Sequence, residues 1–256
     1  MILKTDGLDK IKEGKTKDVY RYADGQVLLC AKDAVTGWII TNSDGSTSIV
    51  EDPGANKVVG QIEGLGLKNI KSSAYYFDLF EKAGLSTHYI DSDFDNATML
   101  VREAEPIGYG LECIVRFFAM GSILRVYPMY LKNGQVLHDF FEITTKDDAA
   151  GDPRISKELL GSQDFGTPMN ESQYEACKQL CLKAAKLIRA DLALLGLTLI
   201  DIKFEIGRIG DKTIIIDEVS AGIMRAYNGD IADDGNKLSE EELADVLATR
   251  IVTEKQ

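Results

Sequence analysis

The sequence of 256 residues contains little histidine and few cysteines. With only two histidines, His88 and His138, a metal centre built mainly from imidazole ligands is nearly excluded. Four cysteines in a chain of this length do not indicate a disulfide framework. Basic residues are also the minority, because 29 Lys and Arg stand against 41 Asp and Glu and the net charge is −12. Such a chain repels polyphosphate backbones, so we expect no nucleic-acid partner, although a local basic pocket can still hold a small anion.

Long apolar runs are absent as well. No stretch of about 18 apolar residues occurs, and the N-terminus lacks the charged and then apolar pattern of a signal peptide. We therefore expect a cytoplasmic protein with no membrane partner. An apolar content of 45% in 256 residues is enough for a large buried core, in one domain or in two closely packed ones.

Short strand signals and helical spacing occur along the whole chain. The expected strands cover residues 18–22, 26–31, 37–41, 87–90, 98–103, 111–118, 135–143, 197–206 and 213–219. The expected helices cover 68–83 and 170–195, the second capped by Asn170, and a closing helix begins at Ser239 with Glu242 completing a capping box.

Two segments between these elements bear on the organisation of the chain. Residues 42–66 are rich in Gly, Ser, Asp and Pro, and we interpret them mostly as a loop. The Pro-Ile-Gly-Tyr-Gly cluster at 106–110 follows a strand and is our candidate hinge. We therefore predict an N-terminal lobe over residues 1–106, rich in β-strands, and a C-terminal lobe over residues 107–256.

The most informative segment begins with the strand predicted over 197–206. Alternate side chains of a strand share a face, so Asp201, Lys203 and Glu205 project together. Asp217 ends the next strand; a connecting loop of three residues places it opposite Glu205, whereas a two-residue loop places the two on opposite faces. Opposed carboxylates favour a cation between them, and hard oxygen ligands suit Mg²⁺. A solvated sheet face balanced by Lys203 explains the same pattern.

A glycine turn near the N-terminus carries two lysines. Gly14-Lys15-Thr16 resembles the end of the P-loop of NTPases, but Asp9 stands where the first glycine is required, and a strand follows instead of a helix. What remains is a turn in which the ammonium groups of Lys15 and Lys17 and nearby backbone N–H groups can hold phosphate oxygens. Taken alone, the pattern is better explained as an ordinary surface turn with exposed lysines.

Arg116 lies near the end of an apolar strand, shortly before Gly121-Ser122. An arginine, a serine hydroxyl and backbone N–H groups together can bind a phosphate monoester. Pairing of Arg116 with a surface carboxylate is the alternative. The charged residues at 146–153 are, by pattern alone, a solvated loop.

Together these segments resemble the SAICAR synthetase (phosphoribosylaminoimidazole-succinocarboxamide synthase) family of purine biosynthesis. The matching pieces are, in order, residues 13–20, 81–84, 111–116 with 121–122, 146–153, 199–207, and 217–220 with Arg225. The resemblance implies an α+β fold of two lobes, in which antiparallel sheets are flanked by helices in an arrangement related to protein kinases and ATP-grasp enzymes. It also implies that the N-terminal lobe holds the nucleotide phosphate loop and the C-terminal lobe the metal and ribonucleotide site.

The activity implied by this resemblance is that of an ATP-dependent carbon–nitrogen ligase. ATP activates the carboxylate of carboxyaminoimidazole ribonucleotide as an acyl phosphate, and the amine of L-aspartate then attacks to give SAICAR, ADP and phosphate. The implied cofactors are ATP and Mg²⁺, the partners are small-molecule substrates, and a homodimer is ordinary for the family.

The resemblance also implies a set of site residues. They are Gly14, Lys15 and Lys17 for the ATP phosphates; Glu205 and Asp217 for Mg²⁺; Arg116, Ser122, Ser220 and Arg225 for the substrates; and Glu112 and Lys203 near the reacting groups.

The sequence departs from the family pattern at positions expected near the substrates other than ATP. Ser220 is followed by Ala221-Gly222 where the family has Pro-Asp, and Phe117 replaces the asparagine that follows the arginine. These changes support a second hypothesis, a paralogous ligase with a different carboxylate acceptor or amine. A third hypothesis, a non-catalytic nucleotide-binding protein, agrees less well with the retained lysines and acids.

Overall fold

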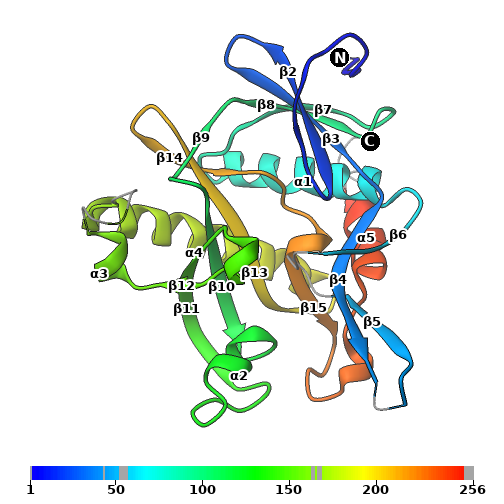
Figure 1. Ribbon diagram of the computed structural model, residues 1–256, viewed down its shortest axis with the longest axis vertical. Coiled ribbons are helices and arrows are strands. Elements are labelled where there is room, and N and C mark those ends of the chain that lie inside the picture. Colours follow the sequence, from blue (N-terminus) through cyan, green and yellow to red (C-terminus); the bar gives the residue numbers. More distant parts are fainter. Residues whose placement is uncertain (1, 43, 52–56, 163–164, 166–168, 251–256) are drawn as a thin grey trace.

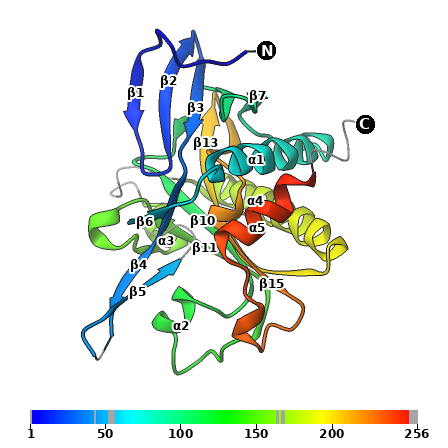
Figure 2. The same cartoon turned by 90° about the vertical axis from the view of Figure 1, so that its right-hand side faces the viewer.

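The computed structural model describes residues 2–42, 44–51, 57–162, 165 and 169–250, and Figures 1 and 2 show it from two sides. The α-helices of this part of the chain are α1 (Leu65–Lys82), α2 (Ser122–Val126), α3 (Lys157–Leu160), α4 (Glu171–Leu194) and α5 (Glu240–Ala248). Its strands are β1 (Lys10–Glu13), β2 (Lys17–Ala23), β3 (Gln26–Ala31), β4 (Ala34–Thr41), β5 (Thr47–Glu51), β6 (Val58–Gln61), β7 (Tyr89–Asp93), β8 (Thr98–Arg102), β9 (Glu105–Pro106), β10 (Leu111–Phe118), β11 (Val136–Thr145), β12 (Arg154–Ile155), β13 (Leu197–Ile209), β14 (Lys212–Ile216) and β15 (Met224–Asn228).

A five-stranded antiparallel sheet, in the order β1-β2-β3-β8-β7, forms one end of the molecule (Figure 1). The hairpin predicted at 18–22 and 26–31 is confirmed as β2 and β3. Because side chains alternate along β3, Leu28 packs with Leu3 on one face while Leu29 joins the main core on the other. Helix α1 contacts β3, β7 and β8, so this sheet is covered on the core side.

The prediction of a loop over 42–66 is wrong in part. Strands β5 and β6 pair with the two edges of β4 and form a three-stranded antiparallel sheet that projects from the molecule (Figure 2). Ile49 of β5 lies opposite Ile39 of β4, and such cross-strand pairing is a tertiary effect that local Gly and Ser content does not reveal. Positions 43 and 52–56 lie outside the described residues.

The largest sheet has seven strands in the order β12-β11-β10-β13-β14, and both β9 and β15 also pair with β13. Strand β10 has the predicted bounds, 111–118. The long strand β13 buries Ile200, Ile202, Phe204 and Ile206, and α4 packs against β13, β14 and β10. One face of the sheet is therefore apolar, and the alternate residues present a polar face on the other side.

The predicted helix caps are confirmed. The Asn170 side chain accepts a hydrogen bond from the backbone of Gln173 at the start of α4, and the Gln173 side chain accepts one from the backbone of Asn170. Ser239 and Glu242 form the same capping box at the start of α5. Helix α5 packs against α1, so the last described helix returns to the N-terminal half of the chain (Figure 2).

The segment before β7 joins the two larger sheets. Thr87 forms a parallel bridge with Ile215 of β14, and the backbone N–H of His88 donates to the Ile215 carbonyl at 3.2 Å. On its other side the His88 carbonyl accepts a hydrogen bond from Arg102 of β8 at 2.7 Å. The backbone of His88 is thereby held between the two sheets.

The α+β class predicted from the sequence is confirmed, and the lobe boundary at residue 106 stays a prediction. The strands of the five-stranded sheet end at Arg102 and those of the large sheet begin at Glu105. One buried apolar cluster nevertheless extends from Val27 to Leu247. Within the described ranges, no helix has the length and apolar content needed to cross a membrane.

Candidate active site

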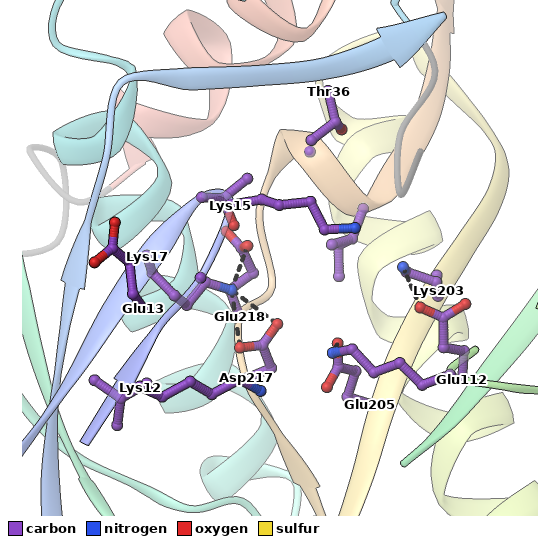
Figure 3. A pocket seen from close by; sticks show the side chains of 16 residues that line it. Lys12, Glu13, Lys15, Lys17, Thr36, Glu112, Lys203, Glu205, Asp217 and Glu218 are labelled. Atoms are coloured by element: carbon purple, nitrogen blue, oxygen red, sulfur yellow. Dashed lines mark hydrogen bonds and ion pairs between the residues drawn. The ribbon is translucent and has the colours of Figure 1, made fainter. Parts of the chain in front are cut away.

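A cavity of about 340 Å³ lies between the turn that joins β1 to β2 and the polar face of the large sheet (Figure 3). This volume is near the low end of the range for small-molecule sites, about 300–1,000 Å³. The residues predicted from the sequence that line it are Gly14, Lys15, Lys17, Glu112, Lys203, Glu205 and Asp217. The fold thus brings the predicted phosphate turn, the predicted metal ligands and the predicted catalytic pair to one place.

The polar face results from the register between β10 and β13. Glu112 lies opposite Glu205 and Arg116 lies opposite Asp201, with Lys203 between them along β13. Residues directly opposite each other in an antiparallel pair point to the same side of the sheet. The predicted shared face of Asp201, Lys203 and Glu205 is therefore confirmed, and β10 adds a glutamate and an arginine to it.

The structure decides between the two loop lengths considered for the hairpin that carries Glu205 and Asp217. The hairpin loop has two residues, Gly210-Asp211, so Glu205 lies opposite Ile216 and not opposite Asp217. Strict alternation would then place Asp217 on the other face. Asp217 instead adopts φ +70° just after β14 ends, and its side chain lines the same cavity as Glu205. A left-handed backbone costs a non-glycine residue roughly 1–2 kcal/mol, and such strain is often found at functional sites.

Lys17 connects the N-terminal turn to the acidic residues after β14. Its Nζ donates to both Asp217 carboxylate oxygens at 2.8 Å and to Glu218 Oε1 at 2.6 Å. Burial would lower the pKa of Lys17, but the two carboxylates outweigh burial and raise that pKa above its ordinary value. Burial would likewise raise the pKa of Asp217, and the charges of Lys17 and Lys146 instead hold it well below its usual range.

Lys146 pairs with Glu205 on the opposite wall. Its Nζ donates to Glu205 Oε1. The residue is exposed and outside any strand, as a solvated loop implies, but its ammonium group is paired at the cavity. Burial and the neighbouring charge of Asp217 raise the pKa of Glu205, although Lys146 opposes both effects. Two partly buried carboxylates, one from β13 and one just after β14, therefore share one cavity, and hard oxygen donors of this kind fit Mg²⁺.

The predicted catalytic pair, Glu112 and Lys203, is a partly buried ion pair. Lys203 Nζ donates to Glu112 Oε1 at 2.6 Å, and Thr144 Oγ1 donates to Glu112 Oε2 at 3.3 Å. Both residues line the cavity.

The phosphate turn depends on Gly14. Its N–H donates to the Lys17 carbonyl at 2.9 Å, and a Cβ at position 14 would lie 2.5 Å from that carbonyl oxygen. A side chain there cannot be accommodated without moving the backbone. The turn therefore requires glycine for lack of space and not for its φ, which is one that other residues also adopt. Lys15 and Lys17 both extend from this turn into the cavity (Figure 3).

The predicted ribonucleotide residues form a separate cluster. Arg116 is 2% exposed; it donates to Glu142 at 2.7 Å, to Asp201 at 2.5 Å and to Ser122 at 2.9 Å. Arg225 donates to the other oxygen of Asp201 at 2.8 Å. These residues lie together but not among those that line the cavity of Figure 3. Their role in binding a phosphate stays a prediction.

Ser220 lies closer to the acids of the cavity. Its hydroxyl is buried and donates to Glu218 Oε2 at 2.6 Å. Glu218 therefore contacts both Lys17 and Ser220. The role of Ser220 as a substrate ligand also stays a prediction.

Several cavity residues were not assigned from the sequence. They are Lys12, Glu13, Thr16, Val19, Thr36, Lys146, Glu218, Gly222 and Ile223. Lys146 lies in segment 146–153, one of the pieces that resemble the family. That resemblance could have identified Lys146 as a site residue, whereas its charge pattern could not. Thr36 comes from β4, and its place depends on tertiary packing.

Three cysteines form a second group of possible ligands. The sulfur atoms of Cys113, Cys177 and Cys181 lie within 4.8 Å of one another and are fully buried. Thiolates there would be uncompensated charges in an apolar core, so these side chains are thiols. As thiols they contribute to the packing of the core.

Comparison with known proteins agrees with this arrangement. The family model described as SAICAR synthetase matches residues 54–245. The chain belongs to the SAICAR synthetase family. A phosphoribosylaminoimidazole-succinocarboxamide synthase of Clostridium tetani is 41% identical over 222 residues, which cover 86% of this chain and 92% of that protein.

Solved structures of SAICAR synthetases share the fold. One, described as a type-2 SAICAR synthetase in complex with ADP, has a TM-score of 0.71 at 23% identity over 94% of this chain and 95% of its own. Another, a SAICAR synthase from Saccharomyces cerevisiae complexed with SAICAR, has a TM-score of 0.67 at 21% identity over 99% of this chain and 89% of its own.

The two departures from the SAICAR synthetase pattern differ in their position. Phe117 is 1% exposed and packs in the core beneath the Arg189 guanidinium, which lies 4.5 Å from the ring centroid. Since its neighbour Arg116 points to the polar face, Phe117 points away from it, and the expectation that this change alters the substrate pocket is wrong. Gly222, in contrast, lines the cavity.

Proposed function

We propose that this chain is an ATP-dependent ligase that joins L-aspartate to the carboxylate of carboxyaminoimidazole ribonucleotide, with SAICAR, ADP and phosphate as products. The observation that carries the proposal is the cavity in which the lysine turn between β1 and β2 faces two partly buried carboxylates, Glu205 of β13 and Asp217 just after β14. The name of the Clostridium tetani relative, and the ADP and SAICAR bound to the two structural relatives, support it.

The lysine turn is suited to the nucleotide's phosphates. Gly14 allows the tight turn, and Lys15 and Lys17 place two ammonium groups at the cavity. Phosphoryl transfer depends on positioning and on cations around the spreading negative charge more than on covalent help from the protein. Lys17 is already held by Asp217 and Glu218, so its ammonium group is positioned before a nucleotide enters.

Glu205 and Asp217 would hold Mg²⁺. Bound there, Mg²⁺ would supply positive charge to the phosphate oxygens during transfer. Lys146 and Lys17, which pair with the two acids, keep both carboxylates in place. Two carboxylates and two ammonium groups have a combined formal charge near zero, so the added cation complements the charge of the nucleotide.

Glu112 and Lys203 lie beside this centre, where the acyl phosphate and the amine would meet. Lys203 can stabilise negative charge that develops on the acyl phosphate carbonyl, and Glu112 fixes the position of Lys203. Arg116, Ser122 and Arg225 would bind the ribonucleotide's phosphate. These three residues lie together, because Arg116 donates to Ser122 and shares Asp201 with Arg225. The proposed contact of Ser220 with the substrate would run through Glu218, the cavity residue to which the buried Ser220 hydroxyl donates.

Gly222 supports a second candidate function, a ligase for a different acid or amine. A Cβ at this position would lie 2.8 Å from Glu240 Oε1, so an aspartate at position 222, as in the family, would require the buried Glu240 of α5 to move. A changed polar group in a substrate pocket can shift preference strongly.

ADP release with ATP, Mg²⁺, the ribonucleotide and L-aspartate tests the main proposal. We expect turnover that requires all four, and turnover no faster than without the ribonucleotide would contradict it. A panel of other amines, measured in parallel, decides between the candidates: a higher kcat/KM with another amine favours the second. We further propose a cytoplasmic homodimer, and light scattering at micromolar concentration tests the dimer.

A further inference from the structure

His88 contacts the segment that presents Asp217 to the cavity. The His88 side chain is 4% exposed, and its Nε2 lies 3.1 Å from the backbone carbonyl oxygen of Asp217. A carbonyl oxygen can only accept a hydrogen bond, so Nε2 carries the proton and donates. The hydrogen bond joins residues that are 129 positions apart in the sequence.

The position of the imidazole is itself fixed. The backbone of His88 donates to Ile215 and accepts from Arg102, which ties it to β14 and β8. The ring makes an edge contact with Phe77 of α1, with 5.5 Å between the centroids. Because burial lowers the pKa of His88 to about 4, the ring is neutral at physiological pH and acts as a hydrogen-bond donor without adding charge to the cavity.

The carbonyl that His88 contacts belongs to the residue whose backbone departs from the strand. Asp217 at φ +70° ends β14, and this conformation brings its carboxylate to the side of Glu205. The left-handed conformation needs support from neighbouring groups, because few residues other than glycine adopt it freely. A donor aimed at the Asp217 carbonyl from a residue whose backbone is held between the two sheets provides that support.

We propose that His88 is a positioning residue for the cation site: its Nε2–H holds the Asp217 peptide in the left-handed conformation and so directs two carboxylates to one Mg²⁺. The inference rests on the proposed function, because it assumes that Asp217 is a metal ligand. Groups that orient a ligand without touching the metal typically change metal affinity by about 10–100-fold when removed.

The experiment uses three variants of the full chain. His88→Phe keeps an aromatic ring against Phe77 but removes the donor, and His88→Gln keeps an N–H donor at a similar reach. Asp217→Asn removes the proposed ligand charge. For each, ADP affinity is measured by calorimetry with excess Mg²⁺ and again with EDTA, and a thermal unfolding curve establishes that the variant is folded.

We expect His88→Phe to lose about tenfold or more of the gain in ADP affinity that Mg²⁺ provides, with little change in affinity in EDTA, and His88→Gln to retain most of that gain. If Mg²⁺ raises the ADP affinity of His88→Phe as much as that of the wild type, the inference is overturned. It is also overturned if the Phe and Gln variants lose this increase in ADP affinity equally. Equal weakening with and without Mg²⁺ would also overturn it, because that pattern is a general loosening of the nucleotide site.

Failure of the metal assignment gives a different result. If Asp217→Asn keeps the full Mg²⁺ gain, Asp217 is not a ligand, and the proposed metal site is contradicted whatever His88 does. If Asp217→Asn loses the gain and His88→Phe does not, only the role of His88 is contradicted. Should His88→Phe not fold, His88→Leu, which is smaller and also lacks a donor, replaces it with the same expected loss.

Discussion

Lys17 and Asp217 lie 200 residues apart in the sequence, yet the lysine Nζ lies 2.8 Å from both carboxylate oxygens of the aspartate. The contact joins the turn after β1 to the end of β14, and thus one sheet to the other across the cavity. A lysine that is ion-paired with a carboxylate is held in position as a cation, and the paired carboxylate stays ionised. Both states are what binding a metal–nucleotide complex requires.

Asp217→Asn should abolish turnover while the fold remains. The amide is nearly isosteric but carries no charge, so it cannot balance Mg²⁺; loss of one such electrostatic partner typically lowers kcat by about 10²–10³. Initial rates of ADP release and a thermal unfolding curve measure the two effects. Asp211→Asn, at the exposed hairpin loop, is the matched control and should be neutral. Near-normal activity of Asp217→Asn would contradict the metal assignment.

Gly14→Ala should weaken nucleotide binding by roughly tenfold, equivalent to about 1.4 kcal/mol. The added methyl group would lie 2.5 Å from the Lys17 carbonyl, so the turn must open and the two lysines must move. ADP affinity by calorimetry is the measurement. Gly25→Ala is the control: it has open space but φ +70°, so it should cost stability of about 1 kcal/mol and leave ADP affinity unchanged. Similar ADP affinities for both variants would show that the Gly14 turn does not hold phosphates.

Arg225→Ala should mainly raise the KM for the ribonucleotide. The guanidinium shares Asp201 with Arg116, and its loss removes one of the cationic groups proposed to meet the phosphate. Steady-state kinetics with each substrate varied in turn gives the two KM values. Arg21→Ala, an exposed arginine paired only loosely with Glu103, serves as the control. An effect confined to the KM for ATP would rule out this role of Arg225.

Asp201→Asn should destabilise the fold in a pH-dependent manner. Burial would raise the pKa of Asp201, but Arg225 and Arg116 outweigh it and lower that pKa below its ordinary value. The substitution leaves the guanidinium groups of Arg116 and Arg225 without the carboxylate that they share. Removing one partner of a buried ion pair lowers the free energy of unfolding by roughly 3–5 kcal/mol. Because the folded pKa is depressed, this stabilisation is complete above the unfolded pKa of about 3.9 and is lost as pH falls through the folded pKa.

The measurement is the free energy of unfolding by urea at several pH values. The difference between the wild type and Asp201→Asn should be constant from about pH 5 to 7 and shrink below about pH 4. Asp78→Asn, which removes an exposed pair with Lys82, should show less than about 1 kcal/mol at every pH. A difference that grows as pH falls would contradict the depressed pKa.

Local patterns predicted much of the fold. The hairpin of β2 and β3, strand β10 and the capping boxes at Asn170 and Ser239 depend on residues that are close in sequence, and the structure confirms them. The three-stranded sheet was missed because β5 and β6 are stabilised by pairing with β4, and their own composition resembles a loop. Lys146 was missed for a similar reason, since its partner Glu205 is 59 residues away.

The amino-acid sequence by itself determined which residues are proposed to carry the chemistry: the lysine turn, the alternating acids and lysine of β13, and the acidic end of β14 are visible from residue type and spacing, and the family resemblance suggests their roles. Only the tertiary structure decided how they meet. The two-residue hairpin loop would separate Glu205 from Asp217, and a left-handed residue supported by long-range contacts returns the aspartate to the shared cavity. Residue spacing sets the face of a regular strand, but a backbone conformation that is locally unfavourable exists only where distant parts of the fold stabilise it.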